Sequence, residues 1–149
     1  MTQDALLAWL HYLAIFVLIV ALTAEAVLLR PGLGAATIRR LANYDRLYLV
    51  AALAVLATGG LRLSLGAKGM AFYLANPWFH AKIGLFVLIG LCSIPPTIAF
   101  LRWRRQAGAA DFSPPDGEVT RARRWVMVET HLIVLMPLFA ALMARGVSM

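Results

Sequence analysis

Long apolar stretches alternate with short polar segments along the chain. The third stretch shows this most clearly, because residues 83–101 contain no charged side chain. It follows Trp78 and Lys82 and ends at the basic segment 102–105. At about 1.5 Å per residue, ~20 residues cross the ~30 Å hydrocarbon layer of a membrane, whose two surfaces favour aromatic and basic side chains. The pattern predicts a transmembrane helix over residues 81–101.

Three more stretches fit the same pattern and predict spans over residues 5–29, 47–63 and 126–144. We therefore expect an all-α protein with a single transmembrane domain over residues 1–149, built as an integral membrane four-helix bundle. Pro95 and Pro96 lie inside the third span, where they should kink the helix and require neighbours that satisfy the freed carbonyls.

The connecting segments carry signals of their own. Residues 31–34 (Pro-Gly-Leu-Gly) should end the first helix, and the second should begin near Ala36, before the membrane. Residues 64–79 read as an interfacial connection, and the prolines of segment 113–117 exclude regular structure there. Within the second span, residues 59–60 (Gly-Gly) should let another backbone approach closely.

Composition agrees with this architecture. With 62% hydrophobic and 14% charged residues, the chain has too little polar surface to cover a soluble globule, so we expect the lipid bilayer as its main partner. The net charge of +7 does not indicate nucleic acid, because nearly all arginines lie in short segments beside the spans. Cys92, the only cysteine, lies within a span, which excludes an intramolecular disulfide and a thiolate metal cluster.

The basic residues divide unequally between the two sides of such a bundle. Ten lie in or beside the first and third connections, namely Arg30, Arg39, Arg40, Arg46, Arg102, Arg104, Arg105, Arg121, Arg123 and Arg124. Four lie toward the other side, namely Arg62, Lys68, Lys82 and Arg145. Cytoplasmic connections carry the excess of Lys and Arg. We therefore place the loop 102–125 in the cytoplasm and both termini outside.

Ionisable side chains at membrane depth are costly, so they usually face a bundle interior. On the first helix His11 and Glu25 are 14 residues apart, nearly four turns, which places them on one face and roughly 21 Å apart along the axis. The predicted topology then produces two polar layers. The outer layer contains His11, Arg62, His80 and Lys82, and the inner layer contains Glu25, Arg30, Asp45, Arg46, Glu129 and His131. Because the inner layer balances acids against bases, we interpret it as a buried network of ion pairs that fixes the helix order.

The outer layer has the residue types that bind haem. Imidazole is the usual axial ligand of haem iron, and a bundle core is a common place for a porphyrin. His11 and His80 are the candidate metal ligands, with Arg62 and Lys82 facing the propionates. The competing interpretations are that His80 is an interfacial hydrogen-bond donor and that Lys82 extends to the headgroups. Lys82, Arg62 and Glu129 are the candidate catalytic residues.

Short motifs over nearly the whole chain resemble known families. They are AWLH in the first span, TGGLRL closing the second, WFHAK from Trp78 to Lys82, and the approach from Arg124 to Glu129 into the fourth. This frame resembles the bacterial J-type protoporphyrinogen oxidases and their copper-resistance-D-like relatives. The segments SIPPTIAFLRWRR and LMARG resemble more closely an uncharacterised bacterial inner-membrane family of domain-of-unknown-function type. The resemblance implies a multi-pass protein of the bacterial inner membrane in which His11 ligates haem b and Lys82 matches the oxidases' lysine.

The chain departs from the oxidase pattern at two places. Residues 47–63 contain no methionine, where that family has one. Arg124 and Glu129 are one residue too far apart for its Arg-x-x-Asn-Glu motif. A haem with a different second ligand, for which His80 is the candidate, is compatible with both differences.

Three functions stay open at this point. The first is a haem-b redox protein that oxidises a tetrapyrrole or passes electrons to quinone. The second is a small transporter or permeation protein for a metal or proton, which uses the face from His11 to Glu25 as its path. The third is a non-catalytic scaffold or accessory subunit in a homo-oligomer or a larger membrane complex. Motifs for nucleotide binding and for a serine nucleophile are absent, which disfavours enzymology of the soluble type.

We predict from the division of basic residues that both termini face outward and that the 106–118 loop is cytoplasmic. A reporter that is active only outside the cytoplasm should work when fused at Met149, and a cytoplasmic reporter should work when inserted in the loop. Activity of the cytoplasmic reporter at Met149 would overturn the assignment.

Overall fold

The computed structural model describes residues 2–65, 69–108 and 112–145, and all regular structure in them is helical. The helices are α1 (Thr2–Leu28), α2 (Ala35–Leu65), α3 (Gly69–Leu74), α4 (Pro77–Gln106) and α5 (Asp116–Ala144). All except α3 are long and apolar enough to cross a membrane, which confirms the predicted all-α fold with four candidate spans. Lys68 and Met149, both used in the topology argument, lie outside the described residues.

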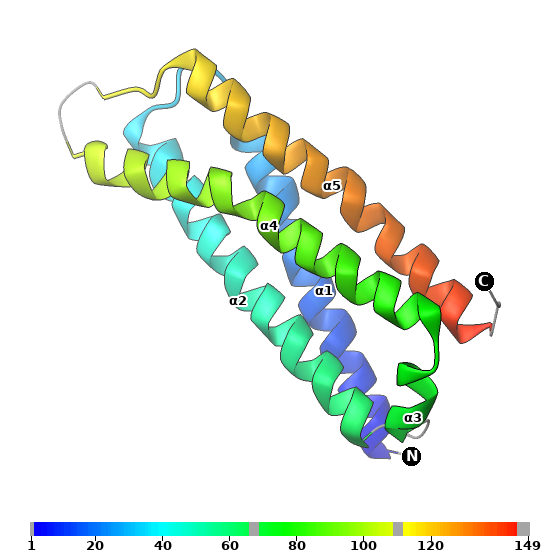
Figure 1. Cartoon of the computed structure of the whole chain (residues 1–149). Helices are drawn as coiled ribbons and strands as arrows, with labels where there is room; N and C mark the ends of the chain where they lie inside the picture. The colour runs from blue at the N-terminus through cyan, green and yellow to red at the C-terminus, as the bar shows by residue number, and fades with distance from the viewer. Residues whose placement is uncertain (1, 66–68, 109–111, 146–149) are drawn as a thin grey trace.

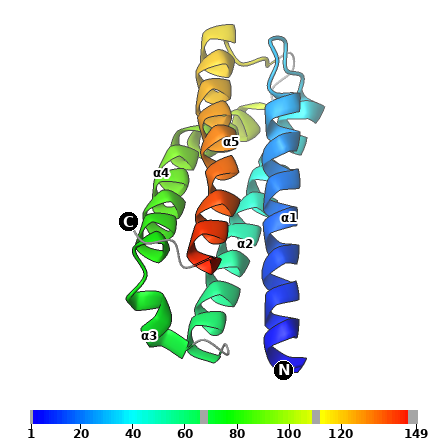
Figure 2. The ribbon, with the colours of Figure 1, turned by 90° about the vertical axis from the view of Figure 1, so that its right-hand side faces the viewer.

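The four long helices form two antiparallel hairpins, α1–α2 and α4–α5, which pack against each other (Figure 1). Contacts of α2 with α4 and of α1 with α5 join the hairpins, so the order around the bundle is α1–α2–α4–α5. The connections α1–α2 and α4–α5 lie at one end of the bundle, while α3 and the start of α1 lie at the other (Figure 2). Following the predicted topology, we call these the inner end and the outer end.

Local sequence explains several helix ends. After α1, Gly32 adopts a φ of +79°, a left-handed conformation that glycine tolerates, and the chain turns there into α2. Before α4, Asn76 Oδ1 accepts a hydrogen bond of 3.0 Å from the Trp78 N–H, and Pro77 occupies the first turn, where its missing N–H costs nothing. The helix start at Ala35 agrees with the one expected near Ala36.

Three segments are more helical than expected. The segment 64–79 contains the end of α2, all of α3 and the start of α4, rather than a plain connection. Helices α4 and α5 both continue into the segment 102–125, which we had read as a loop. Helix α5 begins at Asp116, inside the proline segment 113–117, because prolines just before a helix start deprive it of no internal hydrogen bond.

Helix α4 remains helical through Pro95 and Pro96, and it bends along its length (Figure 1). Neither proline has an N–H, so the carbonyls of Leu91 and Cys92 lose the donors that a regular helix would supply. The expected kink is therefore present without a break in the span.

Packing is dense in the inner half of the bundle and thin in the outer half. Phe100 and Trp103 of α4 are fully buried near the inner end, with ring centroids 5.8 Å apart. On α2 no described residue beyond Val55 is buried, and on α5 none beyond Glu129. The inner half therefore holds most of the apolar core.

A polar clasp joins the end of α4 to the first turn of α5. The buried Trp103 indole Nε1 donates to Glu118 Oε2 at 3.0 Å, and Arg102 Nη2 forms a salt bridge of 2.5 Å with the same oxygen. The clasp is the one salt bridge within the described ranges. It closes the α4–α5 hairpin at the inner end.

We predict that the indole bond of this clasp matters more than its salt bridge. Glu118→Ala should lower the free energy of unfolding in detergent by roughly 1–3 kcal/mol, because it leaves a buried N–H without an acceptor. Glu118→Gln keeps an acceptor oxygen and should cost less. Arg102→Gln removes only an exposed ion pair and should cost under about 1 kcal/mol. A larger loss for Arg102→Gln than for Glu118→Ala would contradict this ranking.

Candidate functional site

The first polar cluster surrounds His11 in the outer half of the bundle, on the buried face of α1. His11 Nδ1 lies 2.9 Å from the Oγ1 of Thr58 on α2. The Thr58 hydroxyl donates its one proton to the Ala54 carbonyl at 2.6 Å, so it can only accept from the imidazole. Nδ1 therefore carries the ring proton, and in the neutral ring Nε2 has the lone pair. The backbone of Val55 also lies within hydrogen-bonding reach of the ring.

A glycine makes room for this ring. A Cβ at position 59 would lie 3.4 Å from His11 Cε1, whereas a Cβ at position 60 would have nothing within 4 Å. We had expected the Gly59–Gly60 pair to admit another backbone. Gly59 instead admits the imidazole, since a side chain from α1 fills the space at this level.

Two cations complete the outer cluster, which we define as His11, Thr58, Arg62 and Lys82. Arg62 and Lys82 each interact electrostatically with His11 and with each other. Arg62 Nε is buried and has no hydrogen-bond partner. Asp4 is the one acidic side chain of the sequence in this half, and it forms no salt bridge with either cation. The outer cluster therefore has positive charge without a described counter-charge, an arrangement that favours an anionic ligand.

His80 does not join this cluster. It is exposed in the first turns of α4, where its Nε2 lies 2.9 Å from the Leu74 carbonyl of α3. Within the described ranges the two imidazoles share no hydrogen bond, and each has a different ring neighbour, Tyr12 for His11 and Phe79 for His80. The structure thus brings three of the four predicted outer residues together and leaves out the proposed second iron ligand.

The second polar cluster lies in the inner half, and all four long helices contribute to it. We define this inner cluster as Glu25 of α1, Asp45 and Tyr48 of α2, Thr97 of α4 and Glu129 of α5. The exposed fractions of Glu25, Asp45 and Glu129 are 3%, 7% and 1%. Thr97 Oγ1 donates to Asp45 Oδ1 at 2.5 Å. Glu25 interacts electrostatically with Asp45 and Glu129, and the Tyr48 hydroxyl faces the Glu129 carboxyl.

The interpretation of the inner layer as a network of ion pairs was wrong. Arg30 and Arg46 are exposed and form no described salt bridge, because both lie where a long side chain can extend to the headgroups. His131 is also exposed, with Nδ1 2.6 Å from the Met127 carbonyl of its own helix. It follows Glu129 by two residues and so faces another side of α5.

Sequence reasoning assigned no hydroxyl group to either cluster. Tyr48 follows Asp45 by three residues, so helical spacing alone could have placed it on the same face. Thr58 and Thr97 had no such signal, because threonine is common in spans and often bonds to its own helix. Thr58 does so while also holding His11.

An apolar layer separates the two clusters. Its buried residues are Ala14, Leu18, Ala21 and Leu22 on α1, Ala51 and Val55 on α2, and Leu85 and Ile89 on α4. No polar or charged side chain is among the buried residues at this level within the described ranges. The face from His11 to Glu25 is therefore polar at its two ends and apolar between them.

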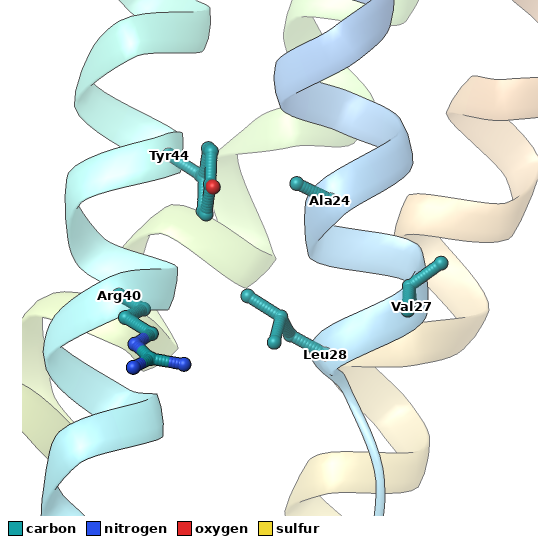
Figure 3. Close-up of a pocket in the computed structure, with 5 residues that line it drawn as sticks. All are labelled: Ala24, Val27, Leu28, Arg40 and Tyr44. Carbon is teal, nitrogen blue, oxygen red and sulfur yellow. The ribbon is translucent and has the colours of Figure 1, made fainter.

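A groove of about 360 Å³ opens between α1 and α2 near the inner end (Figure 3). Its walls are Ala24, Val27 and Leu28 of α1 and Arg40 and Tyr44 of α2. None of these residues belongs to the inner cluster. One cationic and one phenolic side chain beside an apolar wall suit a surface that meets lipid headgroups.

Four long apolar helices with two polar clusters between them define a multi-pass integral membrane protein. The family model described as "Predicted membrane protein (DUF2214)" matches residues 3–148, so the chain belongs to this family, whose function is unknown. The comparison with curated proteins and the comparison with solved structures each gave no match.

We predict that Asp45 and Thr97 stabilise the α2–α4 contact as a pair. Asp45→Asn keeps an acceptor for the Thr97 hydroxyl and should be milder than Asp45→Leu. The double variant Asp45→Leu with Thr97→Val should be more stable than the sum of the single changes implies, with a coupling of roughly 0.5–3 kcal/mol measured by unfolding in detergent. Strictly additive effects would show that the hydrogen bond contributes nothing.

Proposed function

We propose that the chain is a membrane-embedded redox protein of the bacterial inner membrane that binds one b-type haem at the outer cluster. His11 would ligate the iron through Nε2, and Arg62 and Lys82 would pair with the two propionates. When bound, the haem supplies an iron that accepts and donates single electrons.

The hydrogen bond that orients the His11 ring is the main support for this proposal. A histidine that ligates a metal usually donates its other ring N–H to an oxygen, which fixes both the tautomer and the ring orientation. Thr58 supplies that oxygen at 2.9 Å and leaves Nε2 with a lone pair.

The charges around His11 support the same ligand. A b-type haem brings two carboxylates into an apolar site, and each needs a cation or a hydrogen-bond donor. Arg62, with its unpartnered buried Nε, and Lys82 provide these groups beside the imidazole. The thin packing of the outer halves of α2 and α5 is also favourable, because a ligand there would displace few buried side chains.

The resemblance to the J-type protoporphyrinogen oxidases points to the same residues, since it carries onto His11 and Lys82. The sequence suggested His11 and His80 as two iron ligands. Our proposal gives the iron a single protein ligand, because His80 bonds to α3 and not to the outer cluster. A quinone or a tetrapyrrole is the class of redox partner that we favour, since either can reach the cluster from the bilayer.

The alternative of a permeation path from His11 to Glu25 has less support. A path needs polar groups or water along its length, and the buried residues between the two clusters are apolar. A non-catalytic scaffold in a larger complex is the interpretation that follows if no haem binds.

We predict that the protein purified in detergent after haem-replete expression has a Soret band that depends on His11. His11→Ala should abolish the band. Thr58→Val keeps the side-chain shape but removes the oxygen that orients the ring, so haem affinity should fall roughly 10- to 100-fold in a haem titration. His131→Ala, at an exposed position of α5, should leave the spectrum unchanged. A spectrum without haem, or a band that survives His11→Ala, would refute the proposal.

Adjacent glycines offer a matched control for the same spectrum. Gly59→Val places methyl groups against the His11 ring, whereas Gly60→Val makes the same change in helix propensity in open space. We expect Gly59→Val to lose most of the haem and Gly60→Val to retain it. Equal haem content in the two variants would mean that the imidazole does not have to occupy its observed position.

A further inference from the structure

The inner cluster has no part in the proposed haem site, yet it contains three buried carboxyl groups, those of Glu25, Asp45 and Glu129. Glu25 lies about one turn from the inner end of α1, and Glu129 lies 13 residues into α5, roughly 20 Å along that helix. Five titratable side chains meet between these levels, and every long helix supplies at least one. They are Glu25 of α1, Asp45 and Tyr48 of α2, Cys92 of α4 and Glu129 of α5.

The cluster contains no cation within the described ranges. Its residues form no salt bridge, and the arginines nearest in sequence, Arg30, Arg46 and Arg124, are exposed. Nor do the acidic side chains gather closely enough to hold a metal ion in the described part of the chain. Neighbouring carboxylates repel one another strongly where the dielectric constant is low, so protons are the remaining means of neutralising them.

Two of the carboxyl groups also have unused oxygens. Glu25 Oε1 and Glu129 Oε1 are buried and have no hydrogen-bond partner, and both side chains are more than nine-tenths buried. A buried acceptor without a hydrogen-bond donor is costly. This indicates that each oxygen is positioned to bind a proton or a donor reversibly. At the same level Pro96 deprives the Cys92 carbonyl of its helical donor, so an O–H on a neighbouring carboxyl would find an acceptor.

We propose that the inner cluster is a proton-binding site, whose carboxyl groups take up protons from the aqueous phase at the inner end and return them to it. Binding transfers one proton from hydronium or a buffer acid to a carboxylate oxygen and forms one O–H bond. No oxidant, reductant or metal takes part. Glu25, the carboxyl nearest the inner end, is the entry point, and Asp45 and Tyr48 connect it to Glu129.

The apolar layer makes this a site with a single entrance. Between Glu25 and His11 the buried face of α1 carries only Ala14, Leu18, Ala21 and Leu22. Protons that reach Glu129 therefore leave by the inner end again, and the cluster stores charge instead of conducting it across the membrane. The proposal does not depend on haem, since none of its residues touches the outer cluster.

Infrared spectroscopy of the full-length protein in lipid vesicles tests this directly. The carbonyl stretch of buried, protonated carboxylic acids should be present at acidic pH, convert to the carboxylate bands as the pH is raised, and return when it is lowered. The stretch should also shift after transfer to D₂O, because the proton exchanges with solvent. These measurements use the unmodified chain, so a variant that fails to fold leaves the test intact.

Variants then assign the signal. Glu25→Gln and Glu129→Gln should each remove part of the protonated-carboxyl band while leaving any Soret band in place. Asp116→Asn, at an exposed position in the first turn of α5, is the matched control and should leave the band unchanged. A band that responds to neither pH nor D₂O, or that survives both glutamine changes undiminished, would refute the proposal and make the cluster a fixed hydrogen-bonded contact between helices.

Discussion

Hydrocarbon offers no hydrogen bonds, and this constraint determines the rest of the structure. Each backbone N–H and C=O in the bilayer has to find a partner within the chain, which long helices provide. The same demand acts on hydroxyl side chains: Thr23 and Thr130 each return a bond of 2.8 Å to the carbonyl four residues earlier. Groups that cannot bond locally have to face other helices, and so the buried ionisable side chains His11, Glu25, Asp45 and Glu129 lie in two clusters inside the bundle.

Much of this arrangement could be predicted from the sequence. The four spans follow from the length of the apolar stretches, and the burial of Glu25 and Asp45 follows from the cost of a carboxylate in lipid. The shared face of His11 and Glu25 follows from helical periodicity alone. These predictions succeeded because each depends on one helix and its solvent, without reference to a neighbouring helix.

Predictions that needed the positions of two helices were less successful. Arg30 and Arg46 were paired with acids because they lie at a similar depth. Whether a flexible arginine reaches a carboxyl or the headgroups depends also on how its helix is rotated, and depth does not specify that rotation. His80 was matched to His11 in the same way, although the break between α3 and α4 gives its ring a carbonyl partner nearby. The hydrogen bond between His11 and Thr58 could not be predicted for a related reason. It depends on how α1 and α2 are rotated against each other.

The apolar core is concentrated in the inner half of the bundle, so the helices are packed more tightly at one end than at the other. Phe100 and Trp103, near the inner end, belong to the core that joins the two hairpins, and separation of the hairpins there would expose these fully buried side chains. Toward the outer end neither α2 nor α5 buries a residue, so separation there would expose few buried side chains, such as His11 of α1 and Leu85 of α4. The two hairpins are therefore joined mainly at the inner end, and the packing that fixes the spacing of the buried acids leaves the outer ends of the helices less tightly held.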